Sequence, residues 1–334
     1  MKLVTFDADG APRLGAMTAD ESHVVDIQAT QVALNRRPYQ PFRSMLALIE
    51  NGDEALDKMR ETLVLGESGR APEALMPMDQ VKLSAPIPAP PQMRDAMCFE
   101  KHLRQALDQA VLRVAAAAED PEAAAAELRA SGRFSIPQIW YDQPIYYKAN
   151  RFAVTGTGTD VVWPSYSKNM DYEMEFGIFI GKTGKDIPAD RAAEHIFGYS
   201  VFNDFSARDA QMAEMAAQLG PAKGKDFDNA NVIGPCIVTA DEFGDPYDHA
   251  MIVRVNDVEM SRGTSATMHW KFEDLIAHIS QGETLHAGEF IGSGTVGDGC
   301  GLEHGRSLSA GDVVELEVEG IGILRNRVLR EDGE

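Results

Sequence analysis

The sequence predicts an α+β protein, mostly β, in which a mixed β-sandwich or roll follows a small N-terminal α+β domain. From about residue 144 onward, short apolar runs alternate with turn residues, and we expect only three short helices there, at roughly 189–196, 206–218 and 270–280. Four prolines within residues 85–92 cannot continue a helix or a central strand. This succession of strands favours a roll or sandwich over a doubly wound parallel sheet, in which helices alternate with strands.

The N-terminal domain is predicted over residues 1–84. LVTF and VVDI indicate short strands, and FRSMLALIE and EALDKMRETLVL carry apolar residues at helical spacing. The proline-rich segment 85–92 is interpreted as a linker, and residues 93–330 as the larger domain.

The segment 100–130 is rich in alanine, favours helix and is interrupted at Pro121. Alanine faces bury little area, so we expect a pair of weakly anchored helices that can open and close. We predict that residues of about 100–135 form a lid.

The larger domain then continues as strands separated by turn residues. The candidates are PIYYK, DVVW, YEMEFGIFI, GYSVFND, IGPCIVT, MIVRV, FIGSG, VVELEVEG and ILRNRV.

Composition limits the functions open to the chain. Of its 334 residues, 44% are hydrophobic and 25% are charged, which is typical of folded globular proteins. The formal net charge of −21 disfavours nucleic-acid and membrane-surface partners but favours cations. The chain has no apolar run near the ~18 residues of a membrane span, no leader-like N-terminus and no CxxC pair among its three cysteines. These features predict a cytoplasmic protein.

Two acidic motifs suggest a metal site. In a strand, Glu173 and Glu175 lie two residues apart and share a face, an arrangement that suits a hard divalent cation. On this motif alone, a solvated edge of an amphipathic strand is the commoner explanation. Asp204 falls at the end of the predicted strand GYSVFND, ahead of a helix that carries Arg208 and Gln211; a helix cap with a local Arg–Asp pair is the alternative.

Three further features are weaker on their own. Lys225 could face a substrate oxygen, but Gly224-Lys225 lacks the remaining residues of a phosphate loop. Glycines 292, 294 and 297 formally spell GxGxxG without a following helix, so a dinucleotide fold is rejected; this backbone could approach a ligand closely, with Thr295 offering a hydroxyl. His102 is the one histidine near other candidate residues, although a single histidine on a helix is more often structural.

Taken in order, these motifs resemble the fumarylacetoacetate hydrolase family over about residues 90–330. The resemblance rests on Asp95 with His102 seven positions on, Glu173-x-Glu175, the run from Asn203 to Gln211, Gly224-Lys225 and Gly294-Thr295. It implies a mixed β-roll catalytic domain, usually dimeric, that holds one divalent cation: Mg²⁺ or Mn²⁺, with Ca²⁺ as a further option.

The resemblance also implies a role for each matching residue. The metal ligands would be Asp95, Glu173, Glu175 and Asp204. His102 would be the general base, with Glu303 as its carboxylate partner. Lys225 would stabilise negative oxygen, and the residues facing the substrate would be Arg208, Gln211, Lys225 and Thr295. Met97 and Met215 replace two substrate-contacting tyrosines of fumarylacetoacetase, which makes a less polar acyl group plausible.

The function implied is metal-dependent hydrolysis of a carbon–carbon bond in a 1,3-diketone or acylpyruvate, of the fumarylacetoacetate or fumarylpyruvate kind, in the catabolism of aromatic compounds. The first alternative is an oxaloacetate decarboxylase or a lyase, dehydratase or isomerase of 2-keto acids, because all of these reactions pass through an enolate. The second is a non-catalytic ion-binding protein, which would not require His102 and Glu303. The partners expected are a small dicarbonyl or 2-keto acid and a second copy of the chain.

Overall fold

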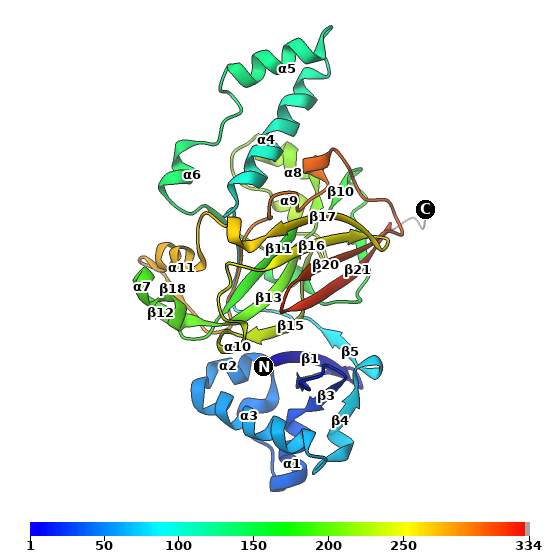
Figure 1. Ribbon diagram of the computed structural model, residues 1–334, viewed down its shortest axis with the longest axis vertical. Coiled ribbons are helices and arrows are strands. Elements are labelled where there is room, and N and C mark those ends of the chain that lie inside the picture. The colour runs from blue at the N-terminus through cyan, green and yellow to red at the C-terminus, as the bar shows by residue number, and fades with distance from the viewer. Residues whose placement is uncertain (331–334) are drawn as a thin grey trace.

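A computed structural model describes residues 1–330. The N-terminal segment contributes antiparallel strands and helices that pack beside them, drawn in blue to cyan in Figure 1. Its strands are β1 (Lys2–Ala8), β2 (Ala11–Met17), β3 (His23–Asp26), β4 (Leu75–Pro77) and β5 (Lys82–Ser84). Its helices are α1 (Ile27–Asn35), α2 (Met45–Glu50) and α3 (Gly52–Glu67).

The N-terminal strands do not form a sheet of their own. Strand β1 pairs with β15 (Asn231–Thr239) through Leu3 and Ile237, so one mixed sheet continues into the larger part of the chain. Beyond β15 its order is β13 (Ile196–Asp204), β11 (Met174–Ile180), β19 (Phe290–Gly292), β6 (Met93–Ala96) and β7 (Tyr146–Lys148). The short β8 (Val154–Thr155) also pairs with β15. Hydrogen bonds of this sheet therefore link residues on both sides of the proline-rich segment.

A second sheet packs on the first. Its strands, in spatial order, are β17 (Val258–Thr264), β16 (Ala250–Val255), β20 (Val313–Val318), β21 (Gly322–Arg330) and β9 (Val161–Trp163). Side chains from both sheets, such as Phe176 and Val201 of the first and Met251, Leu316 and Leu324 of the second, share one buried core. The predicted α+β, mostly β, fold class with a mixed sheet is confirmed.

Short elements close the edges of this sandwich. They are the ribbons β10 (Met170–Asp171) with β14 (Ser206–Ala207) and β12 (Gly184–Lys185) with β18 (Thr284–Leu285), and the helices α7 (Ala189–Ala192), α8 (Arg208–Met215), α9 (Ala222–Lys225), α10 (Ala240–Phe243) and α11 (Phe272–Ser280). The helix expected from residue 206 begins at Arg208, because Ser206 and Ala207 pair with β10 instead.

The alanine-rich segment forms α4 (Glu100–Ala115) and α5 (Pro121–Ala130), followed by α6 (Gln138–Asp142). Figure 1 shows α4 and α5 projecting from the body at the end opposite the N-terminal sheet. Asp120 caps α5 by accepting a hydrogen bond from the Ala123 amide, and Pro121 occupies the first helical position. The two helices pack mainly on each other through Val111, Ala115 and Ala125.

None of the helices between residues 1 and 330 combines the length and the apolar composition that a membrane crossing requires.

The core beneath the shared sheet generates a stability prediction. The Phe290 ring is fully buried and lies 5.0 Å from the Phe179 ring and 5.4 Å from the Phe202 ring, between centroids. Phe290→Ala should lower the free energy of unfolding by about 3–5 kcal/mol, because it leaves a cavity. Phe152→Ala, at an exposed phenylalanine, should change it by less than about 0.5 kcal/mol. Urea denaturation measures both, and equal effects would contradict this account of the core.

Candidate active site

Three buried carboxylates meet where the central strands of the mixed sheet end. Asp95 lies on β6, Glu175 on β11 and Asp204 at the last position of β13. Strands β6 and β11 both flank β19, and β13 flanks β11, so the sheet order brings the three side chains together. Carboxylate oxygens from all three lie within 4.8 Å of one another.

The electrostatics of this cluster favour a bound cation. Burial, together with repulsion from Asp204, raises the pKa of Asp95 to about 7. Burial raises the pKa of Asp204 to about 6, and burial and the neighbouring carboxylates raise that of Glu175 well above its usual range. The Oδ1 atom of Asp204 is buried without a hydrogen-bond partner. An all-oxygen cluster with such an atom fits a hard divalent cation.

Glu173 is placed differently from the other predicted ligands. Its carboxylate accepts hydrogen bonds from Arg208 Nη1 (2.6 Å) and Lys225 Nζ (2.5 Å). Burial alone would raise the pKa of Glu173, but the charges of Lys225 and Arg208 outweigh it and lower the pKa to about 2. The structure therefore groups Glu173 with two cations, and its role as a metal ligand stays a prediction. Glu173 and Glu175 are both buried, which excludes the solvated strand edge.

Lys225 bridges Glu173 and the carboxylate cluster. It lies at the end of α9, is buried, and its Nζ also donates to Asp204 Oδ2 at 2.5 Å. Burial would lower the pKa of Lys225, but Asp204 and Glu173 raise it above its usual value, so the amine stays charged. A surface position for this lysine is excluded.

The glycine-rich segment after β19 supplies backbone donors to the cluster. The Gly294 amide lies 3.0 Å from Glu175 Oε2 and 3.2 Å from Asp95 Oδ1, and Thr295 Oγ1 donates to Glu175 Oε1 at 3.3 Å. Gly294 has a φ of +76°, and a Cβ there would lie 2.4 Å from the Ala96 carbonyl oxygen. Only glycine fits this position. The glycine thus serves to bring the backbone close to the carboxylates and is not part of a dinucleotide motif.

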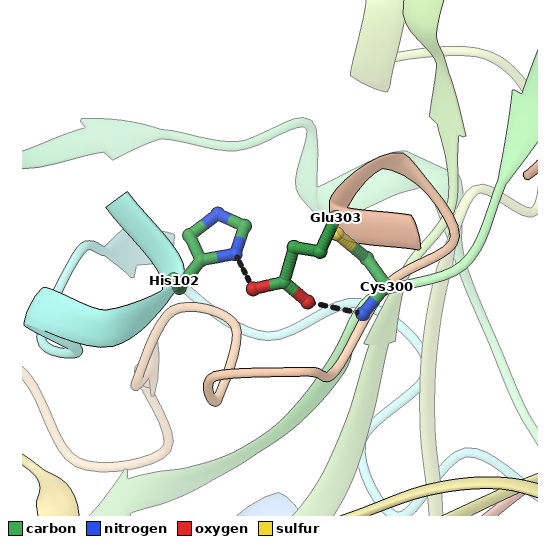
Figure 2. Close-up of side chains that lie close together, drawn as sticks. All are labelled: His102, Cys300 and Glu303. Carbon is green, nitrogen blue, oxygen red and sulfur yellow. Dashed lines mark hydrogen bonds and ion pairs between the residues drawn. The ribbon is translucent and has the colours of Figure 1, made fainter. Parts of the chain in front are cut away.

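His102 and Glu303 form a hydrogen-bonded pair beside the cluster. His102 lies in the first turn of α4, and its Nδ1 is 2.9 Å from Glu303 Oε1. The Cys300 amide donates to Glu303 Oε2 at 2.9 Å, which fixes the carboxylate (Figure 2). Because the carboxylate accepts a hydrogen bond from Nδ1, it leaves Nε2 of a neutral ring free to accept a proton.

A cavity of about 410 Å³ joins these groups. Eight of the ten predicted site residues line it: Asp95, His102, Glu173, Glu175, Arg208, Gln211, Lys225 and Thr295. The other two, Asp204 and Glu303, contact Lys225 and His102. Its remaining lining is largely apolar and includes Met97, Leu103, Ala106, Leu107, Ala110, Ile145, Met212 and Met215. The cavity thus has a charged inner end and a largely apolar wall, to which α4 also contributes Arg113.

Two site residues were missed by the sequence analysis. Tyr147 faces Asp95 in the register of β6 with β7 and donates to Asp204 Oδ2 at 2.7 Å. Burial and the Asp204 charge raise the pKa of Tyr147, so it stays a donor. Asp171 accepts hydrogen bonds from Arg208 Nε (2.8 Å) and from the backbone amides of residues 301 and 302. Alternation along PIYYK could have drawn attention to Tyr147, but its partner depends on strand register.

The fold and an acidic cavity that suits a metal ion are typical of a class of enzymes, and comparison with known proteins identifies the family. The sequence model of the family described as fumarylacetoacetate (FAA) hydrolase C-terminal matches residues 111–329. The chain therefore belongs to the fumarylacetoacetate hydrolase family, whose members are enzymes.

Three relatives illustrate the range of the family. The human mitochondrial oxaloacetate tautomerase FAHD2A is 29% identical over 98% of this chain and 92% of its own. The solved fumarylacetoacetate hydrolase of Exiguobacterium antarcticum has a TM-score of 0.70 and 27% identity, covering 99% of this chain and 100% of that one. A solved maleylpyruvate hydrolase from Sphingobium sp. SYK-6, in complex with manganese(II) and pyruvate, has a TM-score of 0.69 and 21% identity, covering 99% of each chain.

The raised pKa values of the cluster predict a pH dependence. In the metal-free folded protein, Asp95 and Asp204 keep protons up to about pH 7 and 6, whereas a carboxyl of the unfolded chain has a pKa of ~3.9. The folded state thus binds more protons than the unfolded state between about pH 4 and 7, and its stability falls as the pH rises through that window. A bound divalent cation replaces these protons.

The increase in Tm on adding Mg²⁺ or Mn²⁺ should therefore be small near pH 5 and larger near pH 7.5. Thermal unfolding with and without metal measures this difference. Glu175→Ala should abolish the increase at both pH values, whereas Glu194→Ala, at an exposed glutamate paired with Arg191, should leave it intact. A metal-induced increase that is independent of pH, or that persists in Glu175→Ala, would contradict the assignment.

Proposed function

We propose that this protein is a metal-dependent hydrolase that cleaves the carbon–carbon bond of acylpyruvates or related 1,3-diketones with a largely apolar acyl group. The observation that carries the proposal is the His102–Glu303 pair beside the buried carboxylate cluster, in one cavity. A metal-binding protein without catalysis needs the cluster but not this pair.

The cation would be held by Asp95, Glu175 and Asp204, with Glu173 as the fourth predicted ligand. When bound, it would supply Lewis acidity that polarises the keto oxygens of the substrate and stabilises the enolate that leaves. The manganese and pyruvate in the related maleylpyruvate hydrolase support both the type of ion and the type of product.

The side chains of the chain itself would perform the proton transfer. His102 Nε2 accepts a proton from a water molecule, and the hydroxide attacks the acyl carbonyl carbon. Glu303 holds the ring through Nδ1 and stabilises the imidazolium that forms. The bond between the acyl carbon and the pyruvate methylene then breaks, and the enolate takes a proton to give pyruvate. Lys225 and Gln211 face the negative oxygens that develop.

The apolar wall of the cavity indicates the kind of acyl group. On α4, Leu103, Ala106, Leu107 and Ala110 lie at helical spacing and line the cavity. Met97 and Met215 also line it, at positions where the family resemblance implies tyrosines in fumarylacetoacetase. An alkyl or aryl tail would bury apolar surface against this wall, at about 25 cal/mol per Å².

Oxaloacetate tautomerisation is the second candidate, because the FAHD2A relative bears that name over almost the whole chain. A cation held by the same carboxylate cluster would stabilise the enolate. His102 would move a proton between carbon and solvent without activating water. Oxaloacetate carries a second carboxylate, and beside the apolar side chains of α4 the cavity offers it the guanidinium of Arg113.

A product screen separates the candidates. The purified protein with Mg²⁺ or Mn²⁺ is incubated with acylpyruvates of increasing alkyl length and with oxaloacetate, with a metal-free control, and the products are identified by mass spectrometry. The proposal expects pyruvate and the free carboxylic acid, with kcat/KM rising with alkyl length. Accelerated oxaloacetate tautomerisation without acylpyruvate cleavage would overturn it in favour of the second candidate. Metal binding with no turnover of either would overturn both.

The role of His102 gives a kinetic prediction. His102→Ala should lower kcat by at least ~10²-fold, because it removes the general base, while the affinity for the divalent cation stays unchanged. Glu303→Gln should lose less, since its amide oxygen can still accept from Nδ1. His304→Ala, at an exposed neighbour, is the matched control and should keep the wild-type rate. Normal turnover of His102→Ala would remove the proposed base.

We also propose that the outer parts of α4 and α5 move as a lid. The first turns of α4 are fixed to the body: Gln105 donates to Asp298 at 2.5 Å and Gln109 to the Glu303 carbonyl at 3.2 Å. The outer helices bury little apolar surface.

The backbone amides of residues 115–130 should therefore exchange hydrogen fast without metal and more slowly with metal plus oxalate. The amides of residues 103–110 should stay protected in both states. Strong protection of 115–130 in both states would indicate a rigid scaffold.

The cytoplasmic location and the homodimer remain predictions. The first rests on the cysteine content and the second on the family resemblance.

A further inference from the structure

A second group of potential metal ligands adjoins the carboxylate cluster and differs from it in chemistry. A ring nitrogen of His102, the Cys300 sulfur and a carboxylate oxygen of Glu303 all lie within 4.8 Å of one another. Figure 2 shows the three side chains together, at the start of α4 and beside the short helical turn Leu302–His304. All three belong to segments that are held in place by hydrogen bonds.

The segment that carries Cys300 and Glu303 is fixed from several sides. Cys300 forms an isolated β-bridge with Glu173. Its amide holds Glu303 Oε2, and Asp171 accepts from the next two amides, those of Gly301 (2.8 Å) and Leu302 (2.9 Å). His102 is joined to it through the 2.9 Å contact between Nδ1 and Glu303 Oε1. The three donor atoms are therefore already gathered before any ion binds.

The donor set decides which ion this place would take. One nitrogen, one sulfur and one oxygen form a set typical of Zn²⁺, whereas Mg²⁺ and Ca²⁺ prefer oxygen ligands alone. We propose that His102, Cys300 and Glu303 form a soft-metal site that binds Zn²⁺ or Cd²⁺ and is distinct from the all-oxygen cluster of Asp95, Glu175 and Asp204. On binding, the thiol releases its proton to solvent. The proton between His102 Nδ1 and Glu303 moves through solvent to Nε2 of the ring, so that Nδ1 and the carboxylate can both bind the metal.

The charges around the site permit a further cation. Arg208 is near Cys300, but two carboxylates engage its guanidinium, those of Asp171 (2.8 Å) and Glu173 (2.6 Å). Burial raises the pKa of the Cys300 thiol well above its usual range, so the residue is inert without a metal. His102 lines the cavity, which gives an ion a path from solvent.

Occupation of this site has a consequence for activity. A metal bound to the ring and to Glu303 would take the imidazole out of proton transfer, so Zn²⁺ should inhibit the enzyme even with Mg²⁺ in excess. This consequence rests on the proposed function, whereas metal binding itself does not.

Binding is tested on the full-length protein with Mg²⁺ in excess, which keeps the oxygen cluster occupied. Cd²⁺ is titrated in, and the thiolate-to-metal charge-transfer absorption in the ultraviolet is recorded. The band should form in the wild type and disappear in Cys300→Ser. In His102→Ala the affinity for Cd²⁺ should fall by more than ~10-fold. Loss of a residue that only contacts a metal ligand already costs ~10-fold, and His102 is proposed as a ligand itself. Excess Zn²⁺ should displace Cd²⁺ and remove the band.

Two other cysteines provide matched controls. Cys98→Ser tests a buried thiol close to Asp95 and Glu175, and Cys236→Ser tests one buried in β15. Both variants should keep the band. A band that persists in Cys300→Ser, or that is lost in Cys98→Ser instead, would overturn the proposal. If Cys300→Ser does not fold by circular dichroism, Cys300→Ala, which keeps the same backbone amide, takes its place.

Inhibition is measured separately. With a substrate from the product screen and saturating Mg²⁺, Zn²⁺ should inhibit the wild type and Cys236→Ser, and each rate is compared with the zinc-free rate of the same variant. Cys300→Ser should need at least about 10-fold more Zn²⁺ for the same fractional inhibition. Inhibition that more Mg²⁺ relieves would place Zn²⁺ in the oxygen cluster and overturn the inhibitory role. If no substrate is found, the proposed function fails, and the Cd²⁺ band still decides whether the site exists.

Discussion

The mutual repulsion of buried carboxylates is the constraint on which the rest of the site depends. Asp95, Glu173, Glu175 and Asp204 are all nearly inaccessible to solvent, at the end of a sheet whose core is apolar. Such a group is costly to fold unless positive charge or protons compensate it. Lys225 and Arg208 compensate the negative charge on one side of the cluster, and backbone amides of the glycine-rich segment compensate it on another. The negative charge that remains would favour a bound cation. Helices α8 and α9 are therefore as necessary to the site as the strands that carry the carboxylates.

Much of the site could be predicted from local patterns, and the exceptions share a cause. The i, i+2 spacing of Glu173 and Glu175 and the strand end at Asp204 follow from short stretches of sequence. Which carboxylates group together does not, because Lys225 and Arg208 reach Glu173 from segments 52 and 35 residues away. The same holds for Tyr147, which meets Asp95 only through the register of β6 with β7. Roles for His102 and Glu303, 201 residues apart, came from the family resemblance rather than from periodicity.

The fold was predictable to a similar depth. Alternation along the chain indicated most strands of the sandwich, and Pro121 marked the start of α5. Strand β2, with the sequence APRLGAM, and the edge strand β17, with VEMSRGT, were missed because proline, glycine and polar residues weaken their pattern. The proline-rich segment 85–92 gave no sign that strands before and after it join in one sheet. That pairing is decided by backbone hydrogen bonds between Leu3 and Ile237, which leave no local signature.

The pairing of β1 with β15 makes the N-terminal segment a cover for an open sheet edge. Strand β15 has a row of backbone N–H and C=O groups on the side away from β13, and β1 and the short β8 satisfy part of that row. A chain shortened to residues 93–330 would expose those groups along a buried, apolar strand. Exposed edges of this kind pair with one another between molecules. The N-terminal strands, although remote from the cavity, would then help to keep the chain soluble by covering that edge.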